Sequence, residues 1–163
     1  MKKPIKYLVM DIDGTLTDGK IYIGGRGEIF KSFDVKDGYG ISGMLPSAGI
    51  EPIIITGRQS DIVQYRCEEL RIKQAFQGIG DKLEKLIDVL DGDLSQVAYF
   101  GDDLNDIPCM KSVRKAGGVA GCPADAIEEV KNEVDFVSVK NGGYGAAREY
   151  IEWLISKNEN IDD

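Results

Sequence analysis

The sequence predicts an α/β fold with a doubly wound, mainly parallel sheet of Rossmann-like topology. Short apolar runs of strand length alternate with helical patterns along the 163 residues. This alternation favours right-handed crossovers and a parallel sheet. Acidic residues, hydroxyls and glycines follow several of the runs, as they do at strand ends that hold ligands. A hydrophobic content of 42% suits a single domain with a substantial core.

The expected elements can be placed in order along the chain. The main sheet is predicted from six strands near residues 5–11, 51–56, 74–76, 96–101, 117–120 and 135–139. A β-hairpin is predicted from Lys20–Ile23 and Glu28–Phe33, which flank a Gly-rich turn. Helices are predicted near Tyr39–Pro46, from Asp61 through Leu70, from Lys82 to about Leu90, and from Ala146 to Ile155.

The final predicted helix has an apolar face that should pack on the sheet, formed by Ala147, Tyr150, Ile151 and Leu154. The domain is expected to span residues 1–157, and the tail, residues 158–163, is expected to fray. The intervals between the candidate site residues are too short to hold a cap domain. The fold prediction is therefore one domain with a small hairpin extension.

Acidic residues follow two of the predicted strands. Asp11 and Asp13 end the apolar run that begins at Tyr7, and the period-2 alternation of a strand points both side chains to the same side. Asp102 follows a second apolar run and Gly101. Carboxylates at neighbouring strand ends supply the hard oxygen ligands that suit Mg²⁺, which phosphate oxygens commonly complete. The pattern predicts a Mg²⁺ site with a phosphate substrate, and solvated turn residues are the alternative.

Two further positions fit a phosphate site. Thr56 and Gly57 follow a third apolar run, just before a predicted helix, where backbone N–H groups bind anions. Lys82 lies in the first turn of another predicted helix, where the helix dipole disfavours a cation by roughly 0.3–1 kcal/mol. Neutralising a phosphate would explain the lysine. The alternatives are a threonine that only caps a turn and a solvated surface lysine.

Together these segments resemble the haloacid dehalogenase superfamily of phosphatases. The motifs Asp-x-Asp-Gly-Thr, strand-end Thr, helix-start Lys and Gly-Asp-x-x-Asn-Asp occur in its order and cover nearly the whole chain. The likeness is strongest to its capless branch, the phosphatases of 3-deoxy-D-manno-octulosonate 8-phosphate and of related nine-carbon sugar acids. The longer segments that carry this likeness are residues 33–40, 56–60, 66–70 and 142–149.

The resemblance implies a set of chemical roles. Asp11 would be the nucleophile that forms an aspartyl-phosphate, and Asp13 would act first as acid and then as base. Mg²⁺ would be held by the side chains of Asp11 and Asp102 and the backbone carbonyl of Asp13. Thr56 and Lys82 would clamp the phosphoryl oxygens. The outer shell of the metal would come from Asp103, Asn105 and Asp106. The sequence contains no histidine, which excludes a histidine base.

The resemblance also bears on the substrate. Three arginines, Arg58, Arg66 and Arg148, are candidates for binding the carboxylate of a sugar acid, because guanidinium and carboxylate groups pair in a bidentate manner. An arginine directly after Thr-Gly resembles the eight-carbon type of enzyme. Two alternatives stay open: a nonulosonate 9-phosphate phosphatase, and a non-catalytic sugar-phosphate sensor or assembly subunit.

The expected partners are small molecules and further copies of the chain. The resembling family forms tetramers in which the hairpin and the C-terminal Gly-rich segment of one subunit close over a neighbour's site, so a homotetramer is expected. A simple surface arm and a simple loop are the alternatives for these segments. A net charge of −8 opposes unspecific nucleic-acid binding. Three cysteines without metal-ligand spacing, and neither a signal peptide nor a membrane span, favour the cytoplasm.

Overall fold

The computed structural model describes residues 3–160 and confirms the predicted α/β architecture. Six parallel strands form one sheet in the order β5-β4-β1-β6-β7-β8. Their bounds are β1 (Tyr7–Met10), β4 (Glu51–Ile55), β5 (Gln74–Phe76), β6 (Val97–Phe100), β7 (Val119–Cys122) and β8 (Phe136–Val137). Counted along the sheet alone, this is the 3-2-1-4-5-6 order of doubly wound folds. The strand order reverses between β1 and β6, where such folds bind ligands.

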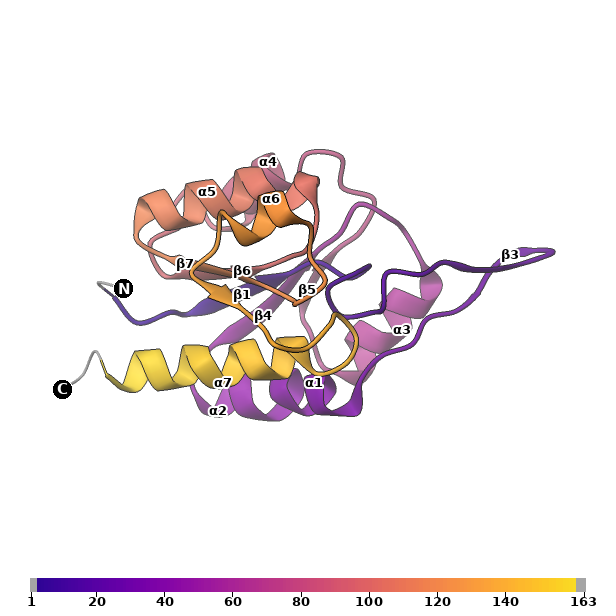
Figure 1. Ribbon diagram of the computed structural model, residues 1–163, viewed down its shortest axis with the longest axis horizontal. Coiled ribbons are helices and arrows are strands. Elements are labelled where there is room, and N and C mark those ends of the chain that lie inside the picture. Colours follow the sequence, from indigo (N-terminus) through magenta and orange to yellow (C-terminus); the bar gives the residue numbers. More distant parts are fainter. Residues whose placement is uncertain (1–2, 161–163) are drawn as a thin grey trace.

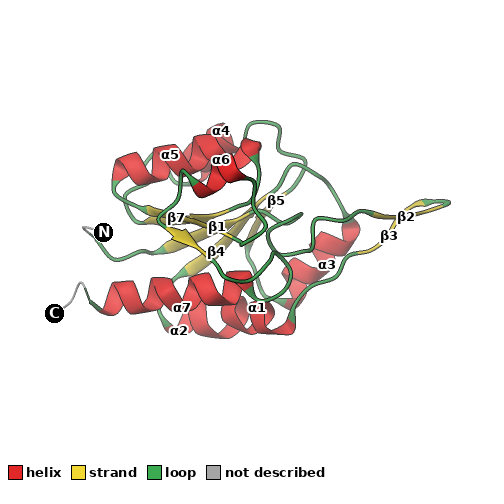
Figure 2. Ribbon diagram, viewed as in Figure 1, coloured by secondary structure: helices red, strands yellow, loops and turns green. Residues whose placement is uncertain are grey.

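Helices cover both faces of the sheet (Figures 1 and 2). One layer holds α4 (Lys82–Val89), α5 (Ile107–Ala116) and α6 (Glu128–Lys131), and the other holds α1 (Val35–Tyr39), α2 (Leu45–Ser47), α3 (Asp61–Glu69) and α7 (Ala146–Glu159). Leu8 and Met10 of β1 belong to the core under α7, whereas Val9 belongs to the core under α4 and α5. The alternation along the strand therefore builds two cores. No helix within residues 3–160 is long and apolar enough to cross a membrane.

The C-terminal helix α7 packs on the sheet through the predicted face. Its residues Ala147, Tyr150, Ile151 and Leu154 are all buried, and the Tyr150 ring stacks on Phe100 at 4.8 Å. The helix runs to Glu159, beyond the predicted end. The Asn158 side chain donates to the Ile5 carbonyl at 3.0 Å and accepts from the Ile5 N–H at 2.8 Å. Asn158 and Glu159 are thus helical, contrary to the expected start of the tail, and residues 161–163 lie outside the described residues.

The predicted hairpin is present but shorter than expected. Strands β2 (Tyr22–Gly24) and β3 (Gly27–Phe30) pair in antiparallel fashion and extend away from the body formed by the sheet and its two helical layers (Figure 1). The chain leaves the hairpin at Lys31, which is buried against the body. Within residues 3–160 the hairpin is the one addition to the sheet and its helices, so this part of the chain has no cap domain.

The helix expected near Tyr39–Pro46 belongs to a longer helical segment. It begins at α1, continues through a π-helical turn, Gly40–Met44, and ends in α2. The start was missed in the sequence, although Asp34 caps it by accepting hydrogen bonds from the N–H groups of Lys36 and Asp37. π-helical turns are rare and often occur near functional sites.

Candidate active site

The carboxyl ends of β1 and β6 bring together the first predicted site residues. Asp11 directly follows β1, and Asp102 follows Gly101 at the end of β6. Lys82 is the first residue of α4, as the sequence predicts. Its Nζ lies 2.8 Å from Asp11 Oδ2 and 2.8 Å from Asp106 Oδ1. These two carboxylates explain why a cation can be buried at a helix N-terminus, where the helix dipole opposes it.

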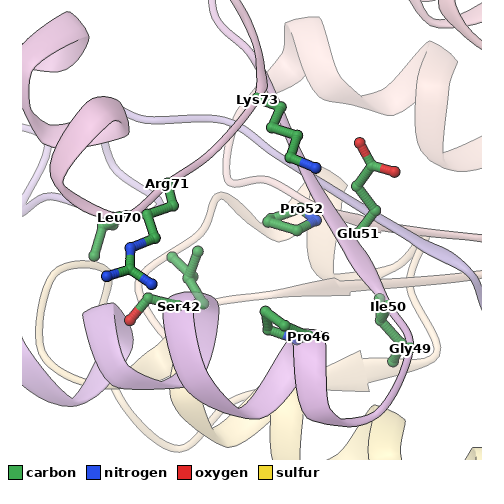
Figure 3. A pocket seen from close by; sticks show the side chains of 10 residues that line it. Ser42, Pro46, Gly49, Ile50, Glu51, Pro52, Leu70, Arg71 and Lys73 are labelled. Carbon is green, nitrogen blue, oxygen red and sulfur yellow. The ribbon is translucent and has the colours of Figure 1, made fainter.

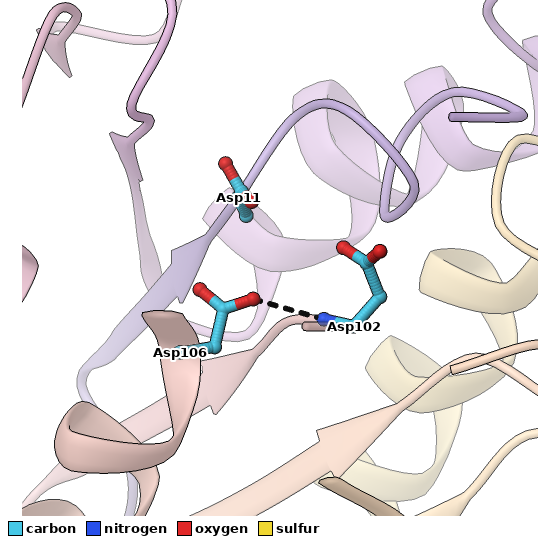
Figure 4. Close-up of side chains that lie close together, drawn as sticks. All are labelled: Asp11, Asp102 and Asp106. Carbon is cyan, nitrogen blue, oxygen red and sulfur yellow. Dashed lines mark hydrogen bonds between the residues drawn. The ribbon is translucent and has the colours of Figure 1, made fainter. Parts of the chain in front are cut away.

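Asp106 is more completely hydrogen-bonded than its neighbours, and Figure 4 shows one of its bonds, from the N–H of Asp102. Its Oδ1 accepts from Lys82 Nζ and from the Tyr99 hydroxyl, each at 2.8 Å. Its Oδ2 accepts from the N–H groups of Asp102 at 3.0 Å and Asp103 at 3.3 Å. Four donors therefore saturate a carboxylate that is completely buried. Asp106 fits the predicted supporting role: it fixes Lys82 and the loop that carries Asp102.

Asp102 is positioned by the loop that follows β1. The Thr15 hydroxyl donates to its Oδ1 at 2.6 Å. Gly14 adopts φ +87°, and a Cβ at this position would lie 2.0 Å from Asp102 Oδ2. Only glycine permits this backbone conformation together with such a close approach. The two strand ends are therefore held together by Gly14 and Thr15, which lie within the predicted motif but were not chosen as site residues.

Charge in this group favours a bound cation. Burial and the charge of Asp106 raise the pKa of Asp11, although Lys82 opposes the rise. Burial, together with the charges of Asp106 and Asp11, raises the pKa of Asp102 to about 7 against the hydrogen bond from Thr15. Among residues 3–160 Asp102 makes no ion pair. The carboxylates are thus short of positive charge.

The donor set fits Mg²⁺. Oxygen atoms of Asp11, Asp102 and Asp106 lie within 4.8 Å of one another, and hard carboxylate oxygens are the ligands this ion prefers. Because four donors already occupy Asp106, the structure favours Asp11 and Asp102 over Asp106 as direct ligands, and their binding of the ion stays a prediction. We call these residues, with those that support them, the core cluster: Asp11, Lys82, Tyr99, Asp102 and Asp106.

Thr56 and Gly57 lie at the neighbouring strand end. Thr56 follows β4 and is buried. Its N–H donates to the Phe76 carbonyl at 3.0 Å, which fixes the position of its backbone. A Cβ at Gly57 would lie 3.7 Å from the Ile79 carbonyl, so packing does not demand glycine there. Residues 57–60 separate Thr56 from the start of α3. Phosphate binding by Thr56 and Gly57 stays a prediction.

Asp13 belongs to a second group at the base of the hairpin. Its Oδ1 lies 2.5 Å from Lys31 Nζ, and its Oδ2 lies 3.6 Å from Arg58 Nε. Lys31 also pairs with Glu28 of β3 at 2.8 Å, and Arg58 approaches Glu28 at 3.4 Å. Glu28 in turn accepts from the Ser60 hydroxyl at 2.5 Å. We call this group the hairpin cluster: Asp13, Glu28, Lys31, Arg58 and Ser60.

The other two candidate arginines, Arg66 and Arg148, lie in the helical layer under the sheet. Arg66 pairs with Glu69 at 2.6 Å and lies over the Phe33 ring. The Arg148 side chain pairs with Glu152 at 2.7 Å. None of these contacts involves the core cluster or the hairpin cluster, whereas Arg58 lies in the hairpin cluster. Substrate binding by Arg66 and Arg148 stays a prediction.

The predicted outer-shell residues differ in their surroundings. Asp103 is exposed, and its side chain accepts from the Leu104 N–H at 2.7 Å at the start of a 3₁₀ turn, Leu104–Asp106. Asn105 is exposed and faces Gly57, with its Nδ2 4.0 Å from the position of a Cβ there. Asp106 closes the turn and supports the site directly. Asp103 caps the start of the same turn and so shapes the loop.

A separate pocket of about 380 Å³ lies at the opposite end of the sheet (Figure 3). It is lined by Glu51 and Pro52 at the start of β4, by Lys73 just before β5, and by residues that include Arg71 and Ser42. Ligands of doubly wound folds bind outside the carboxyl ends of the strands, whereas this pocket lies at the amino ends. We therefore place the active site at the core and hairpin clusters.

Known proteins share both the sequence and the fold. A family profile of haloacid dehalogenase-like hydrolases matches residues 80–149. The chain is 41% identical over 162 residues to the 3-deoxy-D-manno-octulosonate 8-phosphate phosphatase KdsC of Escherichia coli strain K12, a match that covers 98% of this chain and 84% of that protein.

Two solved structures extend the comparison. The phosphatase of the same name from Moraxella catarrhalis, in complex with magnesium, phosphate and KDO, has a TM-score of 0.86 at 38% identity and covers 97% of this chain and 90% of that one. The cobalt-bound phosphatase from Haemophilus influenzae has a TM-score of 0.85 at 37% identity and covers 96% and 91%. The likeness in sequence and in fold extends over almost the full length, including the site, and the chain therefore belongs to the 3-deoxy-D-manno-octulosonate 8-phosphate phosphatase family of haloacid dehalogenase-like hydrolases.

Proposed function

We propose that the protein is a Mg²⁺-dependent phosphomonoester hydrolase that removes phosphate from 3-deoxy-D-manno-octulosonate 8-phosphate. The observation that carries the proposal is the convergence of Asp11, Lys82 and Asp102 at the point where the strand order reverses. The names of the relatives supply the substrate. A second candidate substrate is a nonulosonate 9-phosphate, which presents the same phosphate group to the same residues.

The first half of the reaction transfers the phosphoryl group to Asp11. A carboxylate oxygen of Asp11 attacks phosphorus, and the bond from phosphorus to the sugar oxygen breaks. Asp13 gives its proton to the departing oxygen, so that the sugar leaves as an alcohol. The Ile12 N–H donates to Asp11 Oδ1 at 2.7 Å and Lys82 pairs with Oδ2, and together they hold the nucleophile in one orientation.

The second half returns the enzyme to its starting state. Asp13, now ionised, accepts a proton from a water molecule that attacks phosphorus, and the bond between Asp11 and phosphorus breaks. Inorganic phosphate leaves. Thr56 and Lys82 bind phosphoryl oxygens in both halves, a positioning and electrostatic task. Mg²⁺, held by Asp11, Asp102 and the carbonyl of Asp13, supplies positive charge that offsets repulsion between the carboxylates and the phosphate.

The hairpin cluster supports a subsite for the sugar acid. Arg58 is 48% exposed, and its guanidinium lies beside Asp13, so it can reach a substrate that has its phosphate in the core cluster. A guanidinium pairs well with a carboxylate. Arg66 and Arg148 complete the proposed set of carboxylate ligands, although in this structure they pair with Glu69 and Glu152.

We also propose a homotetramer in the cytoplasm, with the hairpin as the lid on a neighbour's site. Ile23, Ile29 and Phe30 on the hairpin are exposed apolar residues, as an interface requires. Three cysteines, all free and buried, suit a reducing compartment. The Gly-rich segment, residues 142–145, packs closely on its own subunit. A Cβ at Gly142 would lie only 2.0 Å from the Gly14 carbonyl oxygen. Analytical ultracentrifugation that detects only monomer at assay concentrations would contradict the assembly.

The proposed activity is tested by phosphate release in the presence of Mg²⁺. The substrates are octulosonate 8-phosphate, nonulosonate 9-phosphates and hexose phosphates, compared by kcat/KM. A preference for the eight-carbon acid supports the proposal, and a preference for nine carbons moves the protein to the second candidate. Failure to release phosphate from any ester favours a non-catalytic sensor. Asp13→Asn should slow release of the sugar, and a near-normal rate would refute its role.

A further inference from the structure

Lys31 is a buried lysine that neither the motifs nor the proposed mechanism uses. Its side chain is 1% exposed, although it lies only one residue beyond the hairpin strand β3. Burying an ammonium group is costly unless it is paired and hydrogen-bonded. Lys31 meets this condition with two carboxylates, Asp13 at 2.5 Å and Glu28 at 2.8 Å. The lysine therefore joins the hairpin to the site.

Asp13 depends on Lys31 more than Asp11 depends on any one neighbour. Within residues 3–160, Lys31 is the one donor that hydrogen-bonds the Asp13 carboxylate. Arg58 Nε lies 3.6 Å away, beyond a good hydrogen bond, on a side chain that is 48% exposed. Asp11, in contrast, is held at both oxygens, by Lys82 and by a backbone N–H. The orientation of Asp13 thus depends on a single buried contact.

Glu28 and Ser60 hold Lys31 from its other side. Glu28 Oε1 pairs with Lys31, and its Oε2 accepts from the Ser60 hydroxyl at 2.5 Å. Burial opposes the charge of Glu28, yet the hydrogen bonds from Lys31 and Ser60 lower its pKa below the ordinary value. The carboxylate is therefore ionised at neutral pH. The contacts form a chain from β3 through Lys31 to Asp13, anchored at the loop before α3.

We propose that Lys31 is a positioning residue that orients Asp13 toward the departing oxygen of the substrate. The inference rests on the proposed role of Asp13 as acid and base. A general acid must lie within hydrogen-bond reach of the atom it protonates. Lys31 binds Oδ1 of Asp13 and leaves Oδ2 on the side of the exposed Arg58. The hairpin stem is in this way part of the catalytic arrangement.

The experiment separates positioning from simple support of the hairpin. We compare single-turnover release of the leaving group from a sugar-acid phosphate and from p-nitrophenyl phosphate. The sugar alkoxide needs a proton as it leaves, whereas nitrophenolate does not. Because proton transfer contributes typically about 10²- to 10⁴-fold, Lys31→Met should slow release of the sugar by about 30-fold or more. Release of nitrophenolate in the same variant should fall by less than about 3-fold, because this leaving group does not need a proton from Asp13.

Two further variants control for charge and for folding. Lys31→Arg keeps the cation and should recover part of the lost rate. Glu28→Gln keeps Lys31 beside Asp13 but weakens its anchor, and it should give a smaller loss in the same direction even where Lys31→Met does not fold. Lys115→Met, at an exposed site on α5, is the matched control and should leave both rates unchanged. Circular dichroism checks each variant for folding.

Parallel assays of Asp13→Asn separate failure of the inference from failure of the proposed function. A loss selective for the sugar substrate in Asp13→Asn, with equal losses for both substrates in Lys31→Met and Glu28→Gln, overturns the inference and leaves the function standing. Without that selectivity in Asp13→Asn, the role of Asp13 is refuted and the inference falls with it. A selective loss in Asp13→Asn and in the folded variants at Lys31 and Glu28 supports both.

Discussion

The core cluster and the hairpin cluster differ in how the chain builds them. The core cluster lies on strand ends and a helix start, and Lys82 and Asp106 within it are almost completely buried. The hairpin cluster joins the loop after β1 to a projecting hairpin, and Arg58 within it is half exposed. Both clusters hold a proposed catalytic carboxylate. The first is fixed by the body of the protein, and the second depends on a segment that extends away from it.

This difference assigns different tasks to the two clusters. Attack on phosphorus requires the same geometry for every phosphate ester, and rigid elements of the fold provide it. Recognition of the sugar and protonation of its oxygen depend on the leaving group. We propose that those tasks belong to the cluster that the hairpin completes. Changes in the core cluster should therefore affect all substrates alike, and changes in the hairpin cluster should discriminate among them.

The strongest test of this contrast is Asp11→Asn. The amide cannot attack phosphorus, so release of phosphate should fall by about 10³-fold or more for every ester. The fold should persist, because the substitution keeps the shape of the side chain and removes a buried charge. Phosphate assays and circular dichroism measure the two properties. Asp88→Asn, on the outer side of α4, is the control. A nearly normal rate in Asp11→Asn would refute the nucleophile.

Lys82→Met should damage both stability and activity. It leaves Asp11 and Asp106 without their shared cation, and breaking a buried pair costs about 3–5 kcal/mol. Because a divalent cation can replace part of the lost charge, added Mg²⁺ should recover some of this free energy. Urea unfolding with and without Mg²⁺ measures it. Lys115→Met should change stability by less than about 0.5 kcal/mol. Equal stability of the two variants would contradict the role of Lys82 in holding the core cluster.

Gly14→Ala should lower the affinity for Mg²⁺ more than it lowers stability. Its Cβ would meet Asp102 Oδ2 at 2.0 Å, which displaces a proposed ligand. We expect about 10- to 100-fold weaker binding by calorimetric titration, in the range for disturbed metal surroundings. Gly92→Ala is the matched control, because Gly92 has φ +78° but nothing within 4 Å of its Cβ. Both variants share a backbone strain of about 1 kcal/mol. Equal Mg²⁺ affinities would disprove the steric argument.

Much of the fold was predictable from local pattern. The six strands are short apolar runs, and their alternation with helical patterns predicts parallel strands joined by right-handed crossovers. The order of the strands in the sheet was not predicted. The lengths of α7 and of the helical segment at residues 35–47 were not predictable. Asn158 is held by a contact with Ile5, at the other end of the chain. Tertiary contacts of this kind leave no periodic signal in the sequence.

The site divides in the same way. Asp11, Lys82 and Asp102 could be proposed from a single sequence because Asp11 follows β1, Asp102 follows β6 after one glycine, and Lys82 begins α4. Lys31 was missed because it is 18 residues from its partner Asp13 and is brought there by the return of the hairpin. Tyr99 was missed because it lies inside an apolar strand and resembles an ordinary core residue. The core cluster is thus mostly encoded by motif, and the hairpin cluster by tertiary structure.

The smallest expected effect on activity concerns Asp37, which lies outside both clusters. Its carboxylate accepts from the N–H groups of Arg148 at 2.8 Å and Gly145 at 3.3 Å at the start of α7, and burial raises its pKa to about 6. Since the unfolded chain has a pKa of about 3.9, the folded state binds this proton more tightly. Its contribution to stability is therefore full below about pH 4 and is lost as the pH rises to about 6.

Asp37→Asn should remove this pH dependence, because the amide does not titrate. Relative to the variant, the wild-type protein should gain at most about 3 kcal/mol of unfolding free energy when the pH is lowered from 7.5 to 4.5. Urea unfolding at the two pH values measures the difference, with Asp88→Asn as the exposed control. Activity at pH 7.5 should change little if α7 only supports the site. A selective loss on the sugar substrate would instead extend the hairpin cluster's task to this helix, and parallel curves for Asp37→Asn and wild type would refute the raised pKa.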